Sequence, residues 1–135
     1  MPSEKRQFGD RGEEFAAKYL EQKGYKILER NFLAPWGELD IVAAKTGLLG
    51  FKLRELIFVE VKSIEGAGSE RDMNLAAQNV HAKKQQRLIH TAKTYLINKK
   101  IPPAVDWRID VLLVAIDPFS NSAKIEHLEN AVWGK

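Results

Sequence analysis

Asp40, Glu60 and Lys62 are the residues of this sequence whose types and spacing best suit chemistry. Glu60 and Lys62 close the apolar run 56–59, which has the composition of a buried strand. Alternate residues of a strand face the same side, so these two side chains share a face roughly 6 to 7 Å apart. Burying a carboxylate and an ammonium beside Phe58 costs free energy unless the charges are paired or hold a cation. Their position therefore indicates a functional site.

Asp40 joins this pair if the predicted strands 38–44 and 56–62 form a hairpin. Two adjacent carboxylates repel each other, and a divalent ion such as Mg²⁺ or Mn²⁺ relieves this repulsion. Asp40 and Glu60 would hold the ion, which activates a phosphate and a water. Lys62 would orient that water or neutralise charge in the transition state of phosphodiester cleavage. An exposed ion pair between Glu60 and Lys62, worth at most about 1 kcal/mol, is the alternative interpretation.

Glu13 is a candidate third acid. At 100° per residue, the first predicted helix places Glu13 at the border of its apolar face and directs Glu14 well away from it. Glu13 can therefore reach the sheet. A first-turn acid favoured by the helix dipole would also explain this residue.

The second predicted helix carries polar residues on its apolar face near the N-terminal end. Gln85 lies on the same face as Leu88, and Lys84 borders it. Both are candidates for contact with a phosphate or its water. His81 shares this face but lies outside any metal-ligand spacing, which is typical of a structural histidine.

These residues need a scaffold of helices and strands to position them. Hydrophobic periodicity and Gly or Pro punctuation predict the element order α-β-β-β-α-β-β, with a meander of three strands after the first helix. The segment 63–74 is predicted to be a mobile loop that can close over a substrate. The expected helices span 9–23 and 76–99, and the expected strands span 25–32, 38–44, 56–62, 107–116 and 124–128.

The bulk composition limits the classes of protein. A length of 135 residues with 44% hydrophobic residues predicts one domain over residues 1–135. Cysteine is absent, which excludes disulfides and thiolate sites and is typical of the cytoplasm. No apolar stretch approaches the roughly 20 residues of a membrane span. The net charge of +3 permits a polyanionic partner, although solvated surface lysines explain it equally well.

Short motifs run through nearly the whole chain: Gly12-Glu13, Gly24-Tyr25, Arg30-Asn31, Gly37-Glu38-Leu39-Asp40-Ile41-Val42-Ala43, Phe58-Val59-Glu60-Val61-Lys62, Lys84 with Leu88, Ala92 and Tyr95-Leu96, and Arg108-Ile109-Asp110-Val111. Together they resemble the YraN-like uncharacterised protein family. That family is similar to the Holliday-junction resolvases of archaea and belongs with the PD-(D/E)xK, restriction-endonuclease-like fold. The resemblance implies an α/β domain with a mixed central β-sheet flanked by helices.

The resemblance also implies functional residues. It places the catalytic acids on Asp40 and Glu60, the lysine on Lys62 and the helical glutamate on Glu13. It implies a metal-dependent nuclease acting on DNA, including branched or structured DNA. Asp110 matches the family as well, and pairing with a neighbouring arginine explains that residue equally well.

Two departures from the family pattern affect the expected contacts. Ser63 and Ile64 follow Lys62 where relatives often carry a basic residue, so one phosphate contact could be missing. The connection 45–55 is long and apolar, which suits packing against a partner subunit in a homodimer. The alternative function is a nucleic-acid-binding or protein-interaction module with this fold and little catalysis. A third reading is a structural protein whose charges form salt bridges.

Overall fold

The computed structural model describes residues 3–47, 52–66 and 82–132, with the side chains of residues 82 and 83 left out of the description. One mixed sheet has the strand order β1-β2-β3-β4-β5. β3 and β4 are parallel, the other neighbouring pairs are antiparallel, and β1 and β5 form the two edges. The strands are β1 Lys26–Ala34, β2 Gly37–Thr46, β3 Leu53–Glu65, β4 Asp106–Ile116 and β5 Ala123–Leu128.

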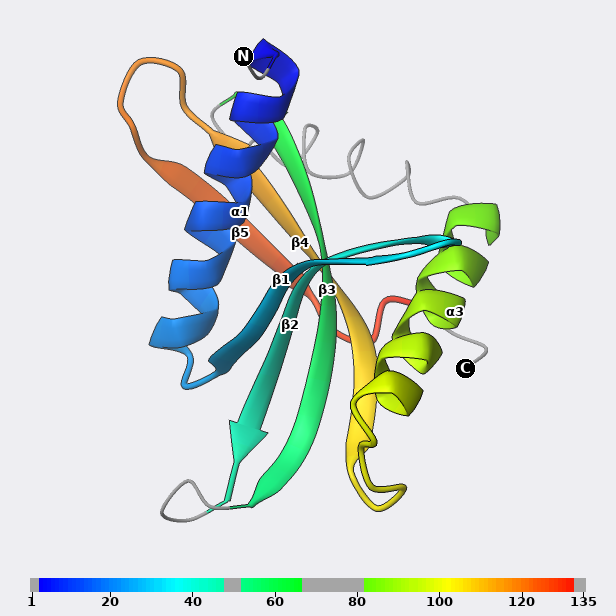
Figure 1. Ribbon diagram of the computed structural model, residues 1–135. Helices are drawn as coiled ribbons and strands as arrows, with labels where there is room; N and C mark the ends of the chain where they lie inside the picture. Colours follow the sequence, from blue (N-terminus) through cyan, green and yellow to red (C-terminus); the bar gives the residue numbers. More distant parts are fainter. Residues whose placement is uncertain (1–2, 48–51, 67–81, 133–135) are drawn as a thin grey trace.

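Two helices cover opposite faces of this sheet (Figure 1). Helix α1, Glu4–Gln22, packs on one face, and helix α3, Ala82–Asn98, lies on the other in the crossover that a parallel β3–β4 pair requires. The α/β fold class and the order α-β-β-β-α-β-β are confirmed. No helix in the described ranges is long and apolar enough to cross a membrane.

Strand periodicity divides the core into two layers. Along β3, Ile57 and Val59 pack on the α1 side, and Leu56 and Phe58 pack on the α3 side. Glu60 and Lys62 continue the second series, as period two dictates. The core layer between the sheet and α3 includes Val42, Phe58, Leu88, Ala92 and Tyr95, and the layer between the sheet and α1 includes Leu20, Ile41, Val59, Leu112 and Val114.

Helix α1 begins at Glu4, five residues before the predicted start. Ser3 is the N-cap, and its hydroxyl accepts a hydrogen bond from the backbone N–H of Arg6 at 3.2 Å. Glu13 therefore lies in the middle of the helix, which removes the explanation of this residue as a first-turn acid. Gly24, at φ 92°, ends the α1 segment as predicted.

The predicted loop 63–74 is partly wrong. Ser63, Ile64 and Glu65 belong to β3, because they continue the parallel pairing with β4 opposite Val114, Ala115 and Ile116. Residues 67–74 lie outside the described residues. So do His81, the predicted helical residues 76–80 and most of the apolar stretch of the 45–55 connection.

Candidate active site

The register between β2 and β3 brings Asp40 and Glu60 together. The last backbone pair of this ladder is Ile41 with Val59, so Asp40 and Glu60 are the next residues opposite each other. Asp40 Oδ2 accepts a hydrogen bond from the backbone N–H of Val61 at 2.8 Å. The Asp40 side chain thus supplies an acceptor to β3 at the point where the backbone ladder stops.

Burial dominates the electrostatics of Asp40, and repulsion from neighbouring carboxylates adds to its effect. Burial raises the pKa of Asp40 to about 8, the Glu60 charge adds to this rise, and the Val61 N–H opposes it. Glu13 and Glu38 contribute smaller charge effects in the same direction. Four acids from α1, β2 and β3 therefore share one region of the molecule, and their mutual repulsion favours a cation there.

Glu60 is almost fully buried and paired. Its side chain is 11% exposed, and its Oε1 lies 2.6 Å from Nζ of Lys84 on α3. The structure therefore places Lys84 at the predicted site, in contact with a carboxylate of that site. Gln85, the next residue on α3, is half-buried. The roles predicted for Lys84 and Gln85 in phosphate contact stay predictions.

Lys62 lies two residues beyond Glu60 on the same face of β3 and is half-buried. Its ammonium forms no ion pair with any residue in the described part of the chain. The alternative of a Glu60–Lys62 ion pair is therefore wrong, because Lys84 takes that place. Lys62 remains available to contact a phosphate or a water.

Glu13 reaches the acidic region from α1. Burial raises the pKa of Glu13, Arg30 opposes this rise, and Asp10, Glu38 and Glu60 add to it. Glu14 instead points to solvent, with its side chain 59% exposed and an ion pair to Arg30. Glu13 is thus the more buried of the two acids, as predicted, whereas Glu14 is exposed but still contacts the edge strand β1 through Arg30.

Asn31 is a site residue that the sequence analysis did not assign. With its amide oriented to suit both acids, Asn31 Nδ2 donates to Glu13 Oε1 at 3.0 Å and to Glu38 Oε1 at 3.2 Å. Its backbone is left-handed, with φ 56°, a conformation that Asn tolerates better than most residues. The Arg30-Asn31 motif was a signal, since an Asn inside a strand suggests a special backbone position.

The donor set suits a weakly coordinated divalent ion. Among the described residues, no group of three or more acidic or histidine side chains is placed to hold a metal. Mg²⁺, however, keeps several waters and is commonly bound by only one or two carboxylates. Asp40 and Glu60 supply that number of carboxylates, one of which already contacts Lys84, and metal binding at this pair stays a prediction.

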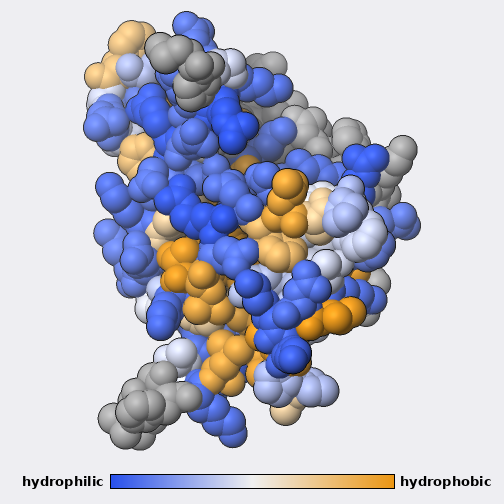
Figure 2. Space-filling model, in the orientation of Figure 1, coloured by the Kyte–Doolittle hydropathy of each residue, from blue (hydrophilic) through white to orange (hydrophobic). Residues whose placement is uncertain are grey.

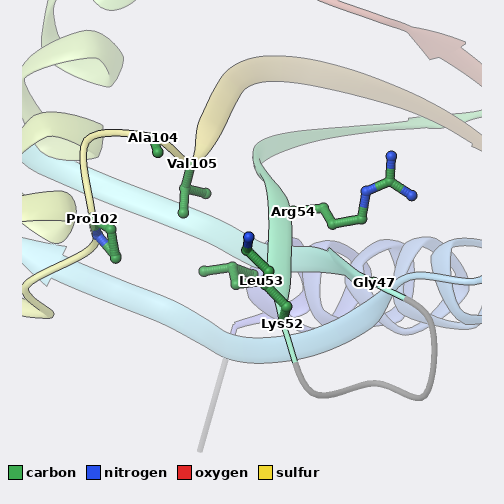
Figure 3. Close-up of a pocket in the computed structure, with 7 residues that line it drawn as sticks. All are labelled: Gly47, Lys52, Leu53, Arg54, Pro102, Ala104 and Val105. Atoms are coloured by element: carbon green, nitrogen blue, oxygen red, sulfur yellow. The ribbon is translucent and has the colours of Figure 1, made fainter.

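A pocket of about 720 Å³ lies away from these acids, at the end of the sheet where β3 begins (Figure 3). Its lining includes Lys52, Leu53, Arg54, Pro102 and Val105 but no acidic side chain from the described residues. The Arg54 side chain extends away from Pro102 and Val105. This pocket contributes nothing to the predicted site.

The fold and the site together define a small α/β protein with a charged cluster: two acids across an antiparallel strand pair and a lysine two residues beyond the second acid. The chain belongs to the uncharacterised protein family UPF0102, which it matches over residues 12–114. It is 34% identical to a UPF0102 protein of Roseiflexus castenholzii, with 98% of each chain covered. It is 32% identical to one from Desulforamulus reducens (98% of this chain, 100% of the relative) and 42% identical to one from Thermotoga petrophila (79% and 88%).

Proposed function

We propose that this protein is a metal-dependent nuclease that hydrolyses phosphodiester bonds in DNA. The observation that carries the proposal is the position of Asp40 opposite Glu60, with Lys62 on the same face of β3. A buried pair of like charges costs folding free energy, so its presence favours a functional explanation.

Asp40 and Glu60 would hold Mg²⁺ or Mn²⁺, which when bound supplies Lewis-acid activation of a phosphate and a water. The raised pKa of Asp40 supports this assignment, since a cation beside the carboxylate stabilises its ionised form. Glu13 would complete the acidic surroundings from α1, and Asn31 would fix its orientation.

Lys62 would stabilise the charge that develops on the phosphate in the transition state, as a half-buried ammonium without an ion-pair partner in the described part of the chain. Lys84 is 47% exposed at its side chain and can turn from Glu60 toward a phosphate. Branched or structured DNA is the proposed substrate, in keeping with the resemblance to resolvases. A cytoplasmic location and a homodimer remain predictions.

The alternative function is a nucleic-acid-binding or protein-interaction module with little catalysis. The Lys84–Glu60 contact favours this alternative, because the ammonium already neutralises one of the two carboxylates without a metal. Catalysis therefore needs a direct test.

The test is cleavage of linear, flapped and four-way DNA with Mg²⁺ or Mn²⁺. We expect Asp40→Asn and Lys62→Ala to lose at least about 100-fold in rate, as when a group that stabilises transition-state charge is removed. Glu13→Gln should lose activity, whereas its neighbour Glu14→Gln, which changes an exposed acid on the same helix, should not. Equal residual cleavage by all variants would assign the activity to a contaminant and refute the proposal.

Metal binding has a readout that does not depend on activity. Mg²⁺ at about 100 times its dissociation constant should stabilise the wild-type fold by about 2.7 kcal/mol. Asp40→Asn should show little of this stabilisation in the same denaturation experiment. DNA binding without cleavage or metal stabilisation would support the alternative function.

A further inference from the structure

The tip of the β1–β2 hairpin is fastened to α3 beside the candidate site. Trp36 stacks flat on His90, with ring centroids 3.9 Å apart and an interplanar angle of 4°. Trp36 Nε1 donates to Thr94 Oγ1 at 2.9 Å. A Cβ at Gly37 would lie 3.0 Å from Thr91 Oγ1, so a bare backbone is what allows this close approach. The pair of rings is therefore held in a fixed position.

This aromatic pair is open to solvent. Trp36 is 39% exposed and His90 is an exposed residue. Each ring covers one face of the other, and both residues keep part of their surface exposed to solvent. Figure 2 shows hydrophobic surface where the hairpin crosses toward α3, and Leu33 of the hairpin is 74% exposed.

Helix α3 adds positive charge between the aromatic pair and Glu60. Its described side chains include the basic residues Lys84 and Arg87, and residues 82–98 contain no Asp or Glu. Lys84 and Arg87 are three residues apart, so they neighbour each other on the helix surface, and Arg87 is exposed. The Arg87 backbone also lies next to Gly37 of the hairpin. Basic residues therefore connect the aromatic pair to Glu60.

The spacing suits a polynucleotide. His90 lies six residues beyond Lys84, about 9 Å along the helix. Trp36 lies four residues before Asp40, about 13 Å along an extended strand. A short length of nucleic acid can span these distances, with its phosphates beside Arg87 and Lys84.

We propose that Trp36 and His90 form a stacking platform for an unpaired nucleobase of the substrate, and that Arg87 contacts the phosphate next to it. This inference deepens the proposed function and rests on it for the position of the cleaved bond. A duplex hides the faces of its bases, so the platform selects substrates with single-stranded segments. That selectivity gives a physical reason for a preference for flapped or branched DNA.

The experiment is fluorescence anisotropy with a labelled oligothymidylate and a labelled duplex, measured in chelator so that neither metal nor cleavage affects binding. Trp36→Ala should weaken oligothymidylate binding about tenfold, the loss expected for one stacked base, and duplex binding less than twofold. Trp36→Phe should restore most of the affinity. Phe119→Ala is the matched control, because Phe119 is an aromatic residue 96% exposed in the β4–β5 turn, and both affinities should stay unchanged.

Arg87→Gln separates charge from stacking. This substitution should weaken binding to both probes. It should also reduce the number of counterions released on binding, which the salt dependence of the affinity reports, by about one. Equal losses on both probes for Trp36→Ala, or no loss, would overturn the platform even if cleavage is observed. A Trp36-dependent preference for single strands without any cleavage would uphold the platform and refute the nuclease. Absence of binding to the oligothymidylate would refute the platform, and absence of cleavage in the assay with metal would refute the nuclease.

Discussion

Asp40 occupies a position that lowers the stability of the fold. Its carboxylate is half-buried, lies opposite Glu60 and accepts a compensating hydrogen bond from the Val61 N–H. An ordinary stability requirement would replace such a residue, so its cost is explained if the charge serves a function.

We predict that Asp40→Asn is more stable than the wild type near neutral pH. Asparagine keeps an acceptor for the Val61 N–H and removes a carboxyl group whose ionisation folding disfavours. The pKa of Asp40 rises from 3.8 to about 8 on folding, so the carboxyl is protonated in both states below about pH 4. Between about pH 4 and about pH 8 the unfolded chain ionises first, and stability falls as pH rises.

Urea denaturation without metal at about pH 5 and about pH 8 measures this effect. The variant should gain roughly 1 to 3 kcal/mol over the wild type at the higher pH, and less at the lower pH. An equal difference at both pH values would show that the Asp40 charge is not the cause.

Part of this site could be predicted from the sequence, and the reason is strand geometry. The alternation of side chains along a strand, together with one hairpin, suffices to bring Asp40, Glu60 and Lys62 to one place. The role of Asn31 could not be predicted in the same way, because it depends on a left-handed backbone inside β1 and on the position of α1 over the sheet. The Lys84–Glu60 contact likewise depends on where the crossover helix packs.

At the scale of elements, α1 can reach the site because Gly12 allows it to approach β3 closely. A Cβ at Gly12 would lie 1.7 Å from Ser63 Oγ and 2.9 Å from Ser63 Cβ. Rotation of Ser63 can relieve the first clash but not the second. Glu13, the next residue, therefore takes its position from this contact.

We predict that Gly12→Ala destabilises the protein. Overpacking costs about 1 to 3 kcal/mol, more than the gain of about 1 kcal/mol in helix propensity. Gly9→Ala on the same helix is the control: nothing lies within 4 Å of its added Cβ, so it should stabilise the fold. Thermal unfolding of both variants is the measurement, and a Gly12→Ala variant as stable as Gly9→Ala would contradict the packing argument.

The element boundaries show what local patterns omit. The start of α1 at Glu4 depends on the hydroxyl of Ser3, which caps the helix and which hydrophobic periodicity alone does not detect. The end of β3 depends on a partner distant in the chain, because 63–65 pair with 114–116. Long-range pairing therefore extended a strand into a segment whose composition suggests a loop.

At the scale of the whole molecule, a second polar cluster joins segments from both ends of the chain. Asp110 on β4 is fully buried and accepts hydrogen bonds from Arg108 Nε at 2.9 Å, His127 Nε2 at 2.7 Å and the backbone N–H of Asn130 at 2.8 Å. Arg108 also pairs with Glu55 and contacts Tyr25 Oη at 3.0 Å. The predicted pairing of Asp110 with a neighbouring arginine is confirmed.

This cluster extends from the sheet to the first helix. His127 Nδ1 lies 3.2 Å from Tyr19 Oη on α1. Asp110 and its partners therefore connect six parts of the chain: α1, the residue before β1, β3, β4, β5 and the segment after β5. Burial raises the pKa of Asp110, but hydrogen bonds from His127, Arg108 and Asn130 N–H outweigh it and hold the pKa below its usual value. Ionised Asp110 is therefore the form that folding favours.

We predict that Asp110→Asn destabilises the whole molecule by about 3 to 5 kcal/mol, since it leaves the half-buried Arg108 and His127 without their fully buried charged partner. Glu129→Gln is the control. Glu129 lies 3.7 Å from Arg108 with its side chain 65% exposed, so its loss should cost no more than about 1 kcal/mol.

Because the pKa of Asp110 is lowered on folding, its contribution is present above about pH 4 and is lost as pH falls through the folded-state value. Asp40 acts in the opposite direction above that pH, so without metal the wild type should be most stable near pH 4 to 5, and Asp40→Asn should move that maximum toward neutral pH. Denaturation curves across this pH range check the prediction, and a maximum shared by both proteins would contradict it.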